Sequence, residues 1–525
     1  MKTKKSQQMS PDRKTIEVFN PATSEKIGEV PSFSLDEARA ALQEVRAAQS
    51  GWAQTPIRRR VEIMHAFASI LHARAHDVAT LLAKENGKSF NEALLFDIIP
   101  VVRLADYYAS HAKRILKNKR LSISLFKNRA SYIHYQPRGV VFVISPWNFP
   151  LGIPAGEVVA ALISGNGVLL KPASITPLIS LKLRELMDEA GLDPQIFQVI
   201  TGPGSMASKL IDTCSREIDY VNFTGSTEIG RSVAAQCGRH LIPCSMELGG
   251  TDPAIVCRDA DIEQAARSVA WGAFANAGQV CASVERVYVH ADIYDDFVKR
   301  LIDYTGTIRL GDPLAMSSEC GAMTSEDQVK IVEEQIEDAC SKGARIVTGG
   351  KRNPEGSMFF EPTVILDANH QMKVLSEESF GPLLPVLKVA SEEEAISLAN
   401  DSPYGLSAYV YTRNRAKGRS IAERLEAGTV MVNETLMTYA LPETPWSGIK
   451  DSGMGRVHSD EGLRDLCRAA HVNYELIRIP RPLWKHFWLW YPYSRQKNAL
   501  AMGILGQTIY NAPWRRCLRA LLGKR

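Results

Sequence analysis

Apolar positions along the chain follow two periods, and each period predicts a different kind of element. They recur at helical spacing in Val61–Arg74 and again in Ile98–Ile115, and residues 36–116 as a whole read as several helices. Between residues 121 and 136 apolar and polar positions alternate instead, with Lys127-Asn128-Arg129 between the two arms. This alternation predicts a long β-hairpin.

Strands and helices alternate from Val140 onward. Strands are predicted at Val140–Ile144, Val168–Leu170, Phe197–Ile200, Tyr220–Phe223 and Val284–His290, and helices at Glu157–Ile163, Pro177–Ala190, Ile262–Asn276, Glu326–Ser341 and Glu392–Asn400. Such alternation favours parallel sheets covered by crossover helices, so the predicted fold class is α/β. One series ends near Gly249 and a second runs from Cys281 to about residue 433, which places a change of domain between Gly249 and Ala260.

Composition and charge distribution indicate the size class of the protein and the kinds of partner it can bind. The 525 residues allow two to four domains at ~150 residues each, and 45% hydrophobic with 23% charged residues is ordinary for a globular protein. The net charge of +4 is uneven, because residues 481–525 carry nine Lys or Arg and no Asp or Glu, which leaves the rest of the chain mildly acidic. A nucleic-acid partner needs a basic face, so none is expected for the main fold.

The nine cysteines show no paired spacing, which suits a reducing compartment and predicts a cytoplasmic protein. Met1–Lys14 lacks the apolar segment of a secretory signal and is expected to be a disordered leader. Cys237, His240 and Cys244 lie close together but have no fourth partner at zinc-like spacing, so no metal site is predicted.

Cys281 stands in a turn of small residues, Asn276–Ser283, between a predicted helix and a predicted strand. A cysteine in such a turn can expose its sulfur while backbone N–H groups point toward it. That environment lowers the pKa of a thiol and makes the thiolate available as a nucleophile. On its own the position is weak, since most cysteines of an intracellular chain are structural.

Six further stretches strengthen the case for Cys281. They are Ser145-Pro146-Trp147-Asn148-Phe149-Pro150, Lys171-Pro172-Ala173-Ser174, Phe223–Gly230, Met246-Glu247-Leu248-Gly249-Gly250, Glu377-Glu378-Ser379-Phe380-Gly381-Pro382 and Ser452-Gly453-Met454-Gly455-Arg456. In order and spacing they resemble the signature stretches of the NAD(P)-dependent aldehyde dehydrogenase superfamily, over about residues 15–478.

The resemblance implies a catalytic role for three residues. Cys281 would attack the aldehyde and carry a thiohemiacetal and then a thioester, and the side-chain amide of Asn148 with the N–H of Cys281 would donate to the oxyanion. Glu247 matches the general base that activates water. Because relatives that acylate coenzyme A generally lack this glutamate, the resemblance implies hydrolysis to the carboxylic acid.

The dinucleotide has two candidate positions. Gly202–Ala207 fits the G-x-G-x-x-A form of a nucleotide-binding turn, but we interpret it as a tight turn between a strand and a helix. The resemblance instead places the pyrophosphate at Gly225, Ser226 and Gly230, at a helix N-terminus that suits an anion.

Other matched residues would surround the cofactor. Ser145, Pro146 and Trp147 lie on the loop beside it, Lys171 would reach the adenosine ribose, and Glu378 with Phe380 would contact the nicotinamide ribose and ring. Many NAD-specific members carry glutamate three positions after the lysine, where this chain has Ser174. The missing anion removes a repulsion against a 2′-phosphate, so the cofactor is NAD or NADP, with NADP accepted.

The resemblance also implies a domain plan and a homodimer or homotetramer. It comprises a leader (1–14), a Rossmann-type cofactor-binding domain (15–118 and 138–249), a catalytic domain (250–467), a β-hairpin oligomerisation arm (119–137 and 468–480, with a strand at Ala470–Ile477) and a basic aromatic C-terminal extension (481–525).

Two alternative functions stay open. One is an NADP-preferring succinate-semialdehyde dehydrogenase, which an arginine pair in the substrate tunnel would support, although only Arg286 follows Cys281 closely. The other is a non-catalytic scaffold relative, against which the intact Asn148, Glu247 and Cys281 argue.

The extension 481–525 mixes aromatic and basic residues, and none of its apolar runs approaches the ~20 residues of a membrane-spanning helix. Packing of its aromatic residues on the body or on a partner subunit is the favoured explanation. A peripheral contact with an anionic membrane surface is the alternative.

Overall fold

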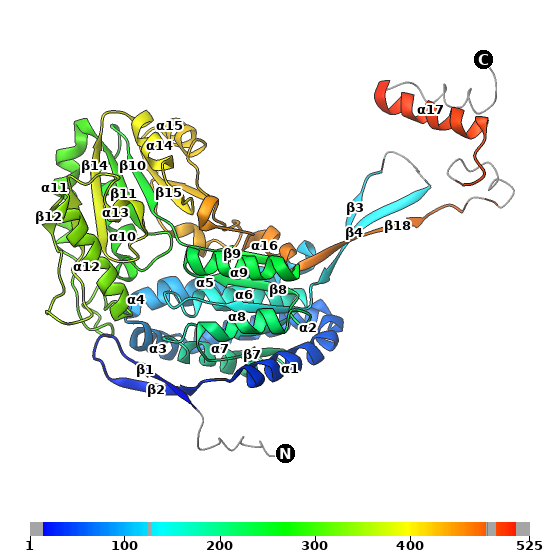
Figure 1. Cartoon of the computed structure of the whole chain (residues 1–525), viewed down its shortest axis with the longest axis horizontal. Coiled ribbons are helices and arrows are strands. Elements are labelled where there is room, and N and C mark those ends of the chain that lie inside the picture. Colours follow the sequence, from blue (N-terminus) through cyan, green and yellow to red (C-terminus); the bar gives the residue numbers. More distant parts are fainter. Residues whose placement is uncertain (1–13, 124–127, 479, 481–489, 511–525) are drawn as a thin grey trace. The chain divides into compact units, whose positions relative to one another are not determined.

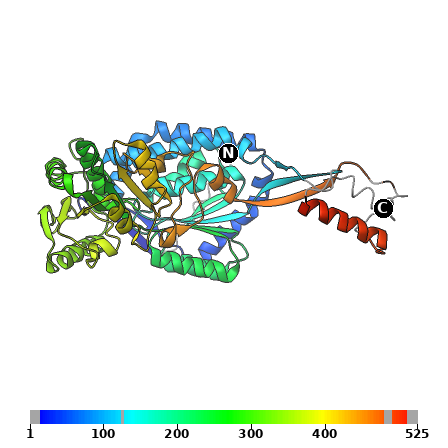
Figure 2. The same cartoon turned by 90° about the horizontal axis from the view of Figure 1, so that it is seen from above.

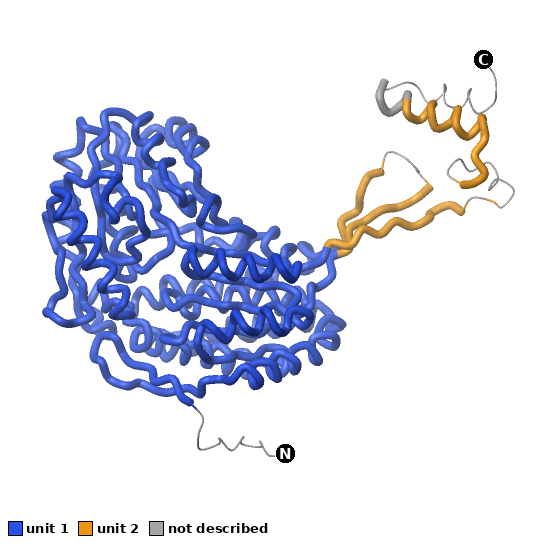
Figure 3. Tube along the Cα trace, in the orientation of Figure 1, with its two compact units in different colours: residues 1–117, 135–468 blue, residues 118–134, 469–525 orange. Residues whose placement is uncertain are grey.

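The computed structural model describes residues 14–123, 128–478, 480 and 490–510. The chain divides into two compact units, residues 1–117 with 135–468 and residues 118–134 with 469–525 (Figure 3). The first unit contains two large β-sheets, a small two-stranded sheet and most of the helices (Figures 1 and 2).

The first large sheet has six strands. Their spatial order is β17 (Gly453–Met454), β9 (Cys244–Glu247), β8 (Tyr220–Thr224), β5 (Val140–Ile144), β6 (Gly167–Lys171) and β7 (Phe197–Val199). Strands β9 to β7 are parallel, and β17 pairs with β9 in the antiparallel sense.

Both faces of this sheet are covered by helices, which is why its central strands are apolar without alternation. In β5, Val141 and Val143 pack in a core with α2, α5, α6 and α7, whereas Val140 and Phe142 pack in another with α1, α8 and α9.

The second large sheet has seven strands. Their order is β12 (Arg345–Thr348), β13 (Thr363–Leu366), β14 (Leu383–Val389), β11 (Val284–His290), β10 (Asp252–Val256), β15 (Ser407–Tyr411) and β16 (Thr429–Val432). All neighbouring pairs are parallel except β12 with β13. Helices α10 and α11 pack on one face, and α12 to α15 supply the cores of the other. The small sheet pairs β1 (Thr15–Phe19) with β2 (Lys26–Pro31).

The helices of the described chain have the following bounds: α1 (Leu35–Gln54), α2 (Ile57–Ala73), α3 (Ala75–Asn86), α4 (Phe90–Glu92), π-helix η1 (Ala93–Ile98), α5 (Ile99–Ile115), α6 (Gly152–Ser164), α7 (Leu178–Glu189), α8 (Gly204–Thr213), α9 (Thr227–His240), α10 (Ile262–Phe274), α11 (Tyr294–Thr305), α12 (Glu326–Ser341), α13 (Lys373–Ser376), α14 (Glu392–Asn400), α15 (Arg415–Ala422), α16 (Ser459–Asp465) and α17 (Arg495–Tyr510), with short 3₁₀ turns η2 (Ala275–Gly278), η3 (Ala291–Ile293), η4 (Met437–Ala440) and η5 (Lys450–Ser452).

The predicted α/β alternation is present, most predicted boundaries lie within one or two residues of the observed ones, and one helix starts well before its predicted position. Helices α12 and α14 have the predicted bounds, but the helix predicted from Glu157 begins at Gly152. Its start is fixed by a distant residue, because the carboxylate of Asp97 accepts hydrogen bonds from the N–H groups of Leu151 (3.1 Å) and Gly152 (2.8 Å).

The second unit includes a three-stranded sheet with the order β18 (Cys467–Glu475), β4 (Arg129–Pro137) and β3 (Lys119–Leu121). β3 and β4 are antiparallel, with Leu121 opposite Ser131, so the predicted hairpin is present. The strand predicted at Ala470–Ile477 lies at residues 467–475. A search of the described residues finds no helix with the length and apolar character needed to cross a membrane.

Candidate active site

The order of the six-stranded sheet creates a crevice at the carboxyl ends of β5 and β8. From β5 the chain continues to β6 and β7 on one side and then returns to β8 and β9 on the other. Ligands of open α/β sheets bind where the strand order reverses in this way. The loop Ser145-Pro146-Trp147 follows β5, and Gly225-Ser226 follows β8.

A cavity of about 280 Å³ opens at this crevice and extends toward the amino end of β11. It is lined by nine residues predicted from the sequence: Pro146, Trp147, Asn148, Gly225, Ser226, Glu247, Cys281, Glu378 and Phe380. The predicted Ser145, Lys171, Ser174 and Gly230 are outside its lining. The fold therefore brings the three proposed catalytic side chains to one cavity from different elements of the first unit.

Cys281 is positioned by an unusual turn. Asn276, Ala277 and Gly278 all have positive φ angles, of 53°, 53° and 74°, a region that non-glycine residues rarely adopt. At Gly278 a side chain would also overlap the backbone of Gly381. This run ends α10 abruptly and leads to Cys281 ahead of β11.

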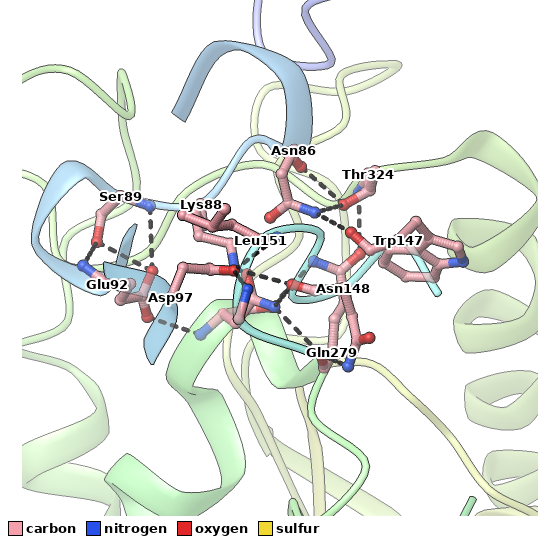
Figure 4. Close-up of polar contacts among 12 residues, drawn as sticks. Asn86, Lys88, Ser89, Glu92, Asp97, Trp147, Asn148, Leu151, Gln279 and Thr324 are labelled. Atoms are coloured by element: carbon pink, nitrogen blue, oxygen red, sulfur yellow. Dashed lines mark hydrogen bonds and ion pairs between the residues drawn. The ribbon is translucent and has the colours of Figure 1, made fainter. Parts of the chain in front are cut away.

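Buried polar contacts hold the turn in this conformation. The N–H of Asn276 donates to the carboxylate of Glu92 at 2.6 Å, and its side-chain amide donates to the carbonyl groups of Asn148 and Gln279, each at 3.1 Å. The side chain of Gln279 donates to the carbonyl of Asn276 at 2.9 Å. Asn148 in turn donates from its amide to the carbonyl of Gln279 at 3.1 Å, so the loop after β5 and the turn before Cys281 are tied together (Figure 4).

A buried ion pair also holds the loop that carries Asn148. Lys88 and Asp97 are fully buried and 2.6 Å apart, and Lys88 also donates to the carbonyl of Asn148 at 2.8 Å. Figure 4 shows this pair beside Asn148 and Leu151. Since Asp97 also binds the first N–H groups of α6, one ion pair fixes both the Asn148 loop and the helix that follows it.

The cavity raises the pKa of the Cys281 thiol. Burial raises its pKa, and the nearby carboxyl groups of Asp252, Glu247 and Glu378 raise it further. The lowered thiol pKa predicted from the turn alone is therefore wrong. The hydrogen bond from the N–H of Ala282 lowers the pKa of Cys281, but burial and the three acids raise it by more.

Glu247 ends β9 with its side chain buried in the cavity. Its two carboxyl oxygens make no hydrogen bond within the described part of the chain, although the indole of Trp446 lies near enough to lower its pKa slightly. Burial, and then repulsion from Glu157, raise the pKa of Glu247 well above that of a free glutamate. A carboxyl group of this kind takes up a proton readily.

The proposed nucleotide residues lie at or just after the carboxyl ends of β5, β6 and β8. Ser226 is the N-cap residue of α9, and its side chain makes no capping bond to the described chain, so the helix N-terminus is left for an anion. Lys171 ends β6, and burial lowers its pKa to about 8. The hydroxyl of Ser174 donates to the carbonyl of Gly202 at 2.9 Å, and the buried hydroxyl of Ser145 has no partner in the described chain. These features fit a phosphorylated dinucleotide. Gly202, which accepts the hydrogen bond of Ser174, belongs to the tight turn that leads into α8.

Glu378 and Phe380 follow helix α13 and line the same cavity. Glu378 accepts a hydrogen bond from the N–H of Gly250 at 3.1 Å, and a side chain at Gly249 would overlap its carboxylate. Burial raises the pKa of Glu378 to about 7. The ring of Phe380 meets Trp147 edge to face, with the centroids 5.3 Å apart.

Several site residues escaped the sequence analysis. The contacts of Lys88, Asp97 and Asn276 join segments far apart in the chain, so no local pattern reveals them. Glu157 carried a signal, because it is the one charged residue in the otherwise apolar helix α6. Its side chain lines the cavity beside Glu247.

Arg286 is absent from the cavity lining. Its guanidinium group is buried and donates to the carbonyl groups of Thr251 (2.8 Å), Leu398 (3.2 Å) and Ala399 (3.1 Å). It therefore ties β11 to the segment before β10 and to the end of α14, and it does not supply an arginine to the cavity.

One cluster outside the cavity has ligand-type side chains, Cys257, Asp259 and Glu392. The ammonium group of Lys417 contacts both carboxylates, at 2.5 Å and 2.9 Å. The cluster is thus balanced by a lysine and gives no indication of a metal.

The fold and the site together define the class: an α/β enzyme in which a cysteine thiol lines a cavity at the position where such sheets bind nucleotides. A family model described as the aldehyde dehydrogenase family matches residues 8–472. A Mycobacterium ulcerans (strain Agy99) protein named "Putative succinate-semialdehyde dehydrogenase (NADP(+)) 2" is 38% identical over 456 residues, which are 86% of each chain.

Solved structures agree. An E. coli NADP-dependent enzyme superposes with a TM-score of 0.84 at 34% identity, covering 88% of this chain and 95% of its own. An aldehyde dehydrogenase from Bacillus cereus, solved as an NAD+ complex, gives 0.84 at 33% identity, covering 88% and 94%. The chain belongs to the aldehyde dehydrogenase family, and the predicted family, fold class and NAD(P)-dependent oxidation of an aldehyde are confirmed.

Proposed function

We propose that the chain oxidises an uncharged aldehyde with an apolar body to the carboxylic acid, through a thioester on Cys281 that Glu247 helps to hydrolyse. The observation that carries this proposal is the convergence of Cys281, Asn148 and Glu247 on one cavity of about 280 Å³.

The residues divide the chemistry between them. The thiol of Cys281 gives its proton to solvent through the open cavity, and its sulfur attacks the aldehyde carbon. The developing oxyanion accepts hydrogen bonds from the N–H of Cys281 and the amide of Asn148. That amide carries two hydrogens, and since one is donated to Gln279 the other is left for the oxyanion. Bound NAD(P)+ supplies the hydride acceptor that oxidises the carbon held on Cys281. Glu247 then takes a proton from the water that attacks the thioester.

The cofactor would be held by Ser226 at the start of α9, by Lys171 and Ser174 beside the adenosine ribose, and by Glu378 with Phe380 at the other end. We propose that NADP is used at least as well as NAD. Two observations support this proposal. Ser174 is uncharged at the position where a glutamate would repel a 2′-phosphate. The ammonium group of Lys171 donates to the carbonyl of Pro172 and not to a carboxylate, so its positive charge is not neutralised by that bond.

The cavity lining decides between an apolar aldehyde and a carboxylated one. Aromatic and aliphatic side chains dominate it, among them Tyr108, Leu406, Tyr439 and Trp446. Among the described residues that line it, Arg456 is the only Lys or Arg, and its side chain is exposed. Burying a substrate carboxylate beside acidic side chains, with no buried cation among the described lining residues to pair with it, is costly. This argues against succinic semialdehyde, whatever the names of relatives state.

The test is NAD(P)H formation from a panel of aldehydes that includes succinic semialdehyde and uncharged aromatic and aliphatic aldehydes of similar length. We expect turnover with the uncharged aldehydes, none with Cys281→Ala, and in Glu247→Gln a single turnover that stops at the thioester. A kcat/KM that is highest for succinic semialdehyde contradicts the proposed substrate class, and activity of Cys281→Ala contradicts the mechanism.

We further propose that the sheet of β18, β4 and β3 joins subunits into a dimer or tetramer. Its outer strands have free edges within the described chain, and such edges pair readily with another strand. Light scattering of the purified chain measures the mass of the assembly. Val472→Pro removes a backbone N–H from β18 and should reduce this mass. An unchanged mass contradicts the proposal that this sheet joins subunits.

For the C-terminal extension we propose a peripheral contact with an anionic membrane surface. Exposed aromatic residues near its start support the contact, with Tyr491 81% and Tyr493 59% exposed. Eight cysteines of the described chain are free thiols, which supports a reducing compartment such as the cytoplasm.

A further inference from the structure

We propose that Glu157 accepts from Glu247 the proton that Glu247 takes from the hydrolytic water, an inference that rests on the proposed role of Glu247. The two carboxyl groups then act as a relay during release of the acid. Glu157 has no other assignment in the site.

The placement of Glu157 is unusual for a charged residue. It lies in the middle of α6, whose other side chains are uncharged, and it is only 7% exposed. Its side chain lines the same cavity as Cys281 and Glu247. Its Oε1 accepts a hydrogen bond from the hydroxyl of Thr224 at 3.4 Å, whereas its Oε2 is buried without a partner in the described chain.

Thr224 connects this group to the reaction centre. It is the last residue of β8, and its register partner on the neighbouring strand β9 is Glu247. The carboxyl group of Glu157 thus lies at the end of β8, next to the end of β9 that carries Glu247. Consistent with this closeness, Glu157 is the main charged group that raises the pKa of Glu247 after burial itself.

A purely structural role explains these contacts poorly. A structural carboxylate is expected to satisfy both oxygens, because an unpartnered buried oxygen costs about 1–3 kcal/mol. Here three of the four carboxyl oxygens of Glu157 and Glu247 are buried without a partner in the described chain. Such oxygens are available to water, substrate or a shared proton.

The groups around Glu157 and Glu247 do not neutralise two carboxylates, so a proton shared by the pair must balance one of the two negative charges. Among the neighbouring titratable groups, burial raises the pKa of Tyr108 and Tyr439 and lowers the pKa of His458 to about 4, so these three are neutral. Cys281 and Glu378 line the same cavity, and Arg456, the one Lys or Arg among its described lining residues, has an exposed side chain. Asp97, which also faces Tyr439, is already paired with Lys88. Two carboxylates at close range cannot both stay ionised, and burial raises the pKa of Glu157 to about 8.

The proton balance is simple. Water gives one proton to the carboxylate of Glu247, and the resulting hydroxide forms a bond to the thioester carbon. The bond from carbon to sulfur breaks, its electron pair stays on the sulfur of Cys281, and the carboxylic acid is released. Glu157, which holds the proton shared by the pair at rest, gives that proton to solvent through the open cavity, and its carboxylate then accepts the proton of Glu247. Glu247 is again a base.

The experiment uses the full chain and separates acylation from hydrolysis. In Glu157→Gln we expect a burst of NAD(P)H of normal amplitude, followed by a steady-state rate lowered at least about tenfold. The rise of kcat with pH that a group of pKa about 8 produces in the wild type should disappear. Added imidazole should restore part of the rate, and Glu157→Asp should retain more of it than Glu157→Gln.

A matched control is Glu85→Gln. Glu85 is also a buried carboxyl group whose pKa is raised to about 8, but it binds the N–H groups of Leu178 and Ile179 and is outside the cavity lining. We expect its pH profile to match the wild type. A kcat of Glu157→Gln within twofold of the wild type, or a burst that falls together with the steady-state rate, overturns the proposal.

One measurement avoids folding defects altogether. The steady-state rate of the wild type in mixtures of H₂O and D₂O should depend on the deuterium fraction with curvature, because two protons move. A linear dependence, indicating one proton, overturns the relay. If Glu247→Gln turns over normally, the proposed base is wrong, whereas loss in Glu247→Gln with normal hydrolysis in Glu157→Gln overturns only the relay.

Discussion

At the scale of single residues, position has changed the chemistry of Cys281. Burial and three neighbouring acids raise the pKa of its thiol, so the thiolate fraction at pH 7 is smaller than for a free cysteine. We expect iodoacetamide to label Cys281 slowly at pH 7 and increasingly as the pH rises beyond 9, as followed by mass spectrometry. The exposed Cys340 is the internal reference, and faster labelling of Cys281 than of Cys340 at pH 7 contradicts the prediction.

Ser174 and Lys171 should set the cofactor preference. Introducing a carboxylate by Ser174→Glu should lower kcat/KM for NADP relative to NAD at least tenfold, or ~1.4 kcal/mol. Because the pKa of Lys171 is lowered to about 8, its positive charge is present below that pH and lost above it. The KM for NADP should therefore rise between pH 7 and pH 9 while the KM for NAD changes little. A wild-type preference for NAD above tenfold contradicts the prediction.

At the scale of elements, the ion pair of Lys88 and Asp97 couples stability to catalysis. Asp97→Ala leaves a buried ammonium without its partner and removes the acceptor for the start of α6, which should cost about 3–5 kcal/mol in the free energy of unfolding. Denaturant unfolding measures this cost, and kcat should fall because the Asn148 loop loses its support. The control is Glu62→Ala, which breaks an exposed pair with Arg58 and should cost under ~1 kcal/mol.

The same scale shows what sequence patterns can reach. Period and alternation were enough for β5, α12 and α14, because burial of one face or both faces leaves a local record in the chain. They missed the left-handed turn at Asn276 and Ala277, whose conformation is held by Glu92, a residue distant in sequence. Sequence closeness to Cys281 also says nothing about which way a strand residue points, and Arg286 is buried outside the cavity lining.

At the scale of the whole molecule, the C-terminal extension is the part that the enzyme chemistry does not require. Residues 481–525 carry nine Lys or Arg and no acid, and each basic residue near an anionic surface contributes about 1 kcal/mol to binding. Lys497 donates to the carbonyl groups of Trp490 (2.6 Å) and Pro492 (2.9 Å), so it orders the aromatic turn. This turn carries the exposed side chains of Tyr491 and Tyr493 in a part of the sequence rich in basic residues.

We therefore expect the full chain to sediment with vesicles containing phosphatidylglycerol, and less with phosphatidylcholine alone or in high salt, because screening weakens exposed charges. A chain ending at Pro480 should remain in the supernatant while keeping its dehydrogenase activity, which serves as the folding control. Replacing Tyr491 and Tyr493 by serine should weaken sedimentation without changing the charge, and so separates the aromatic contribution from the electrostatic one. Equal and negligible sedimentation of the full and shortened chains contradicts the contact and leaves packing on the enzyme as the role of these residues.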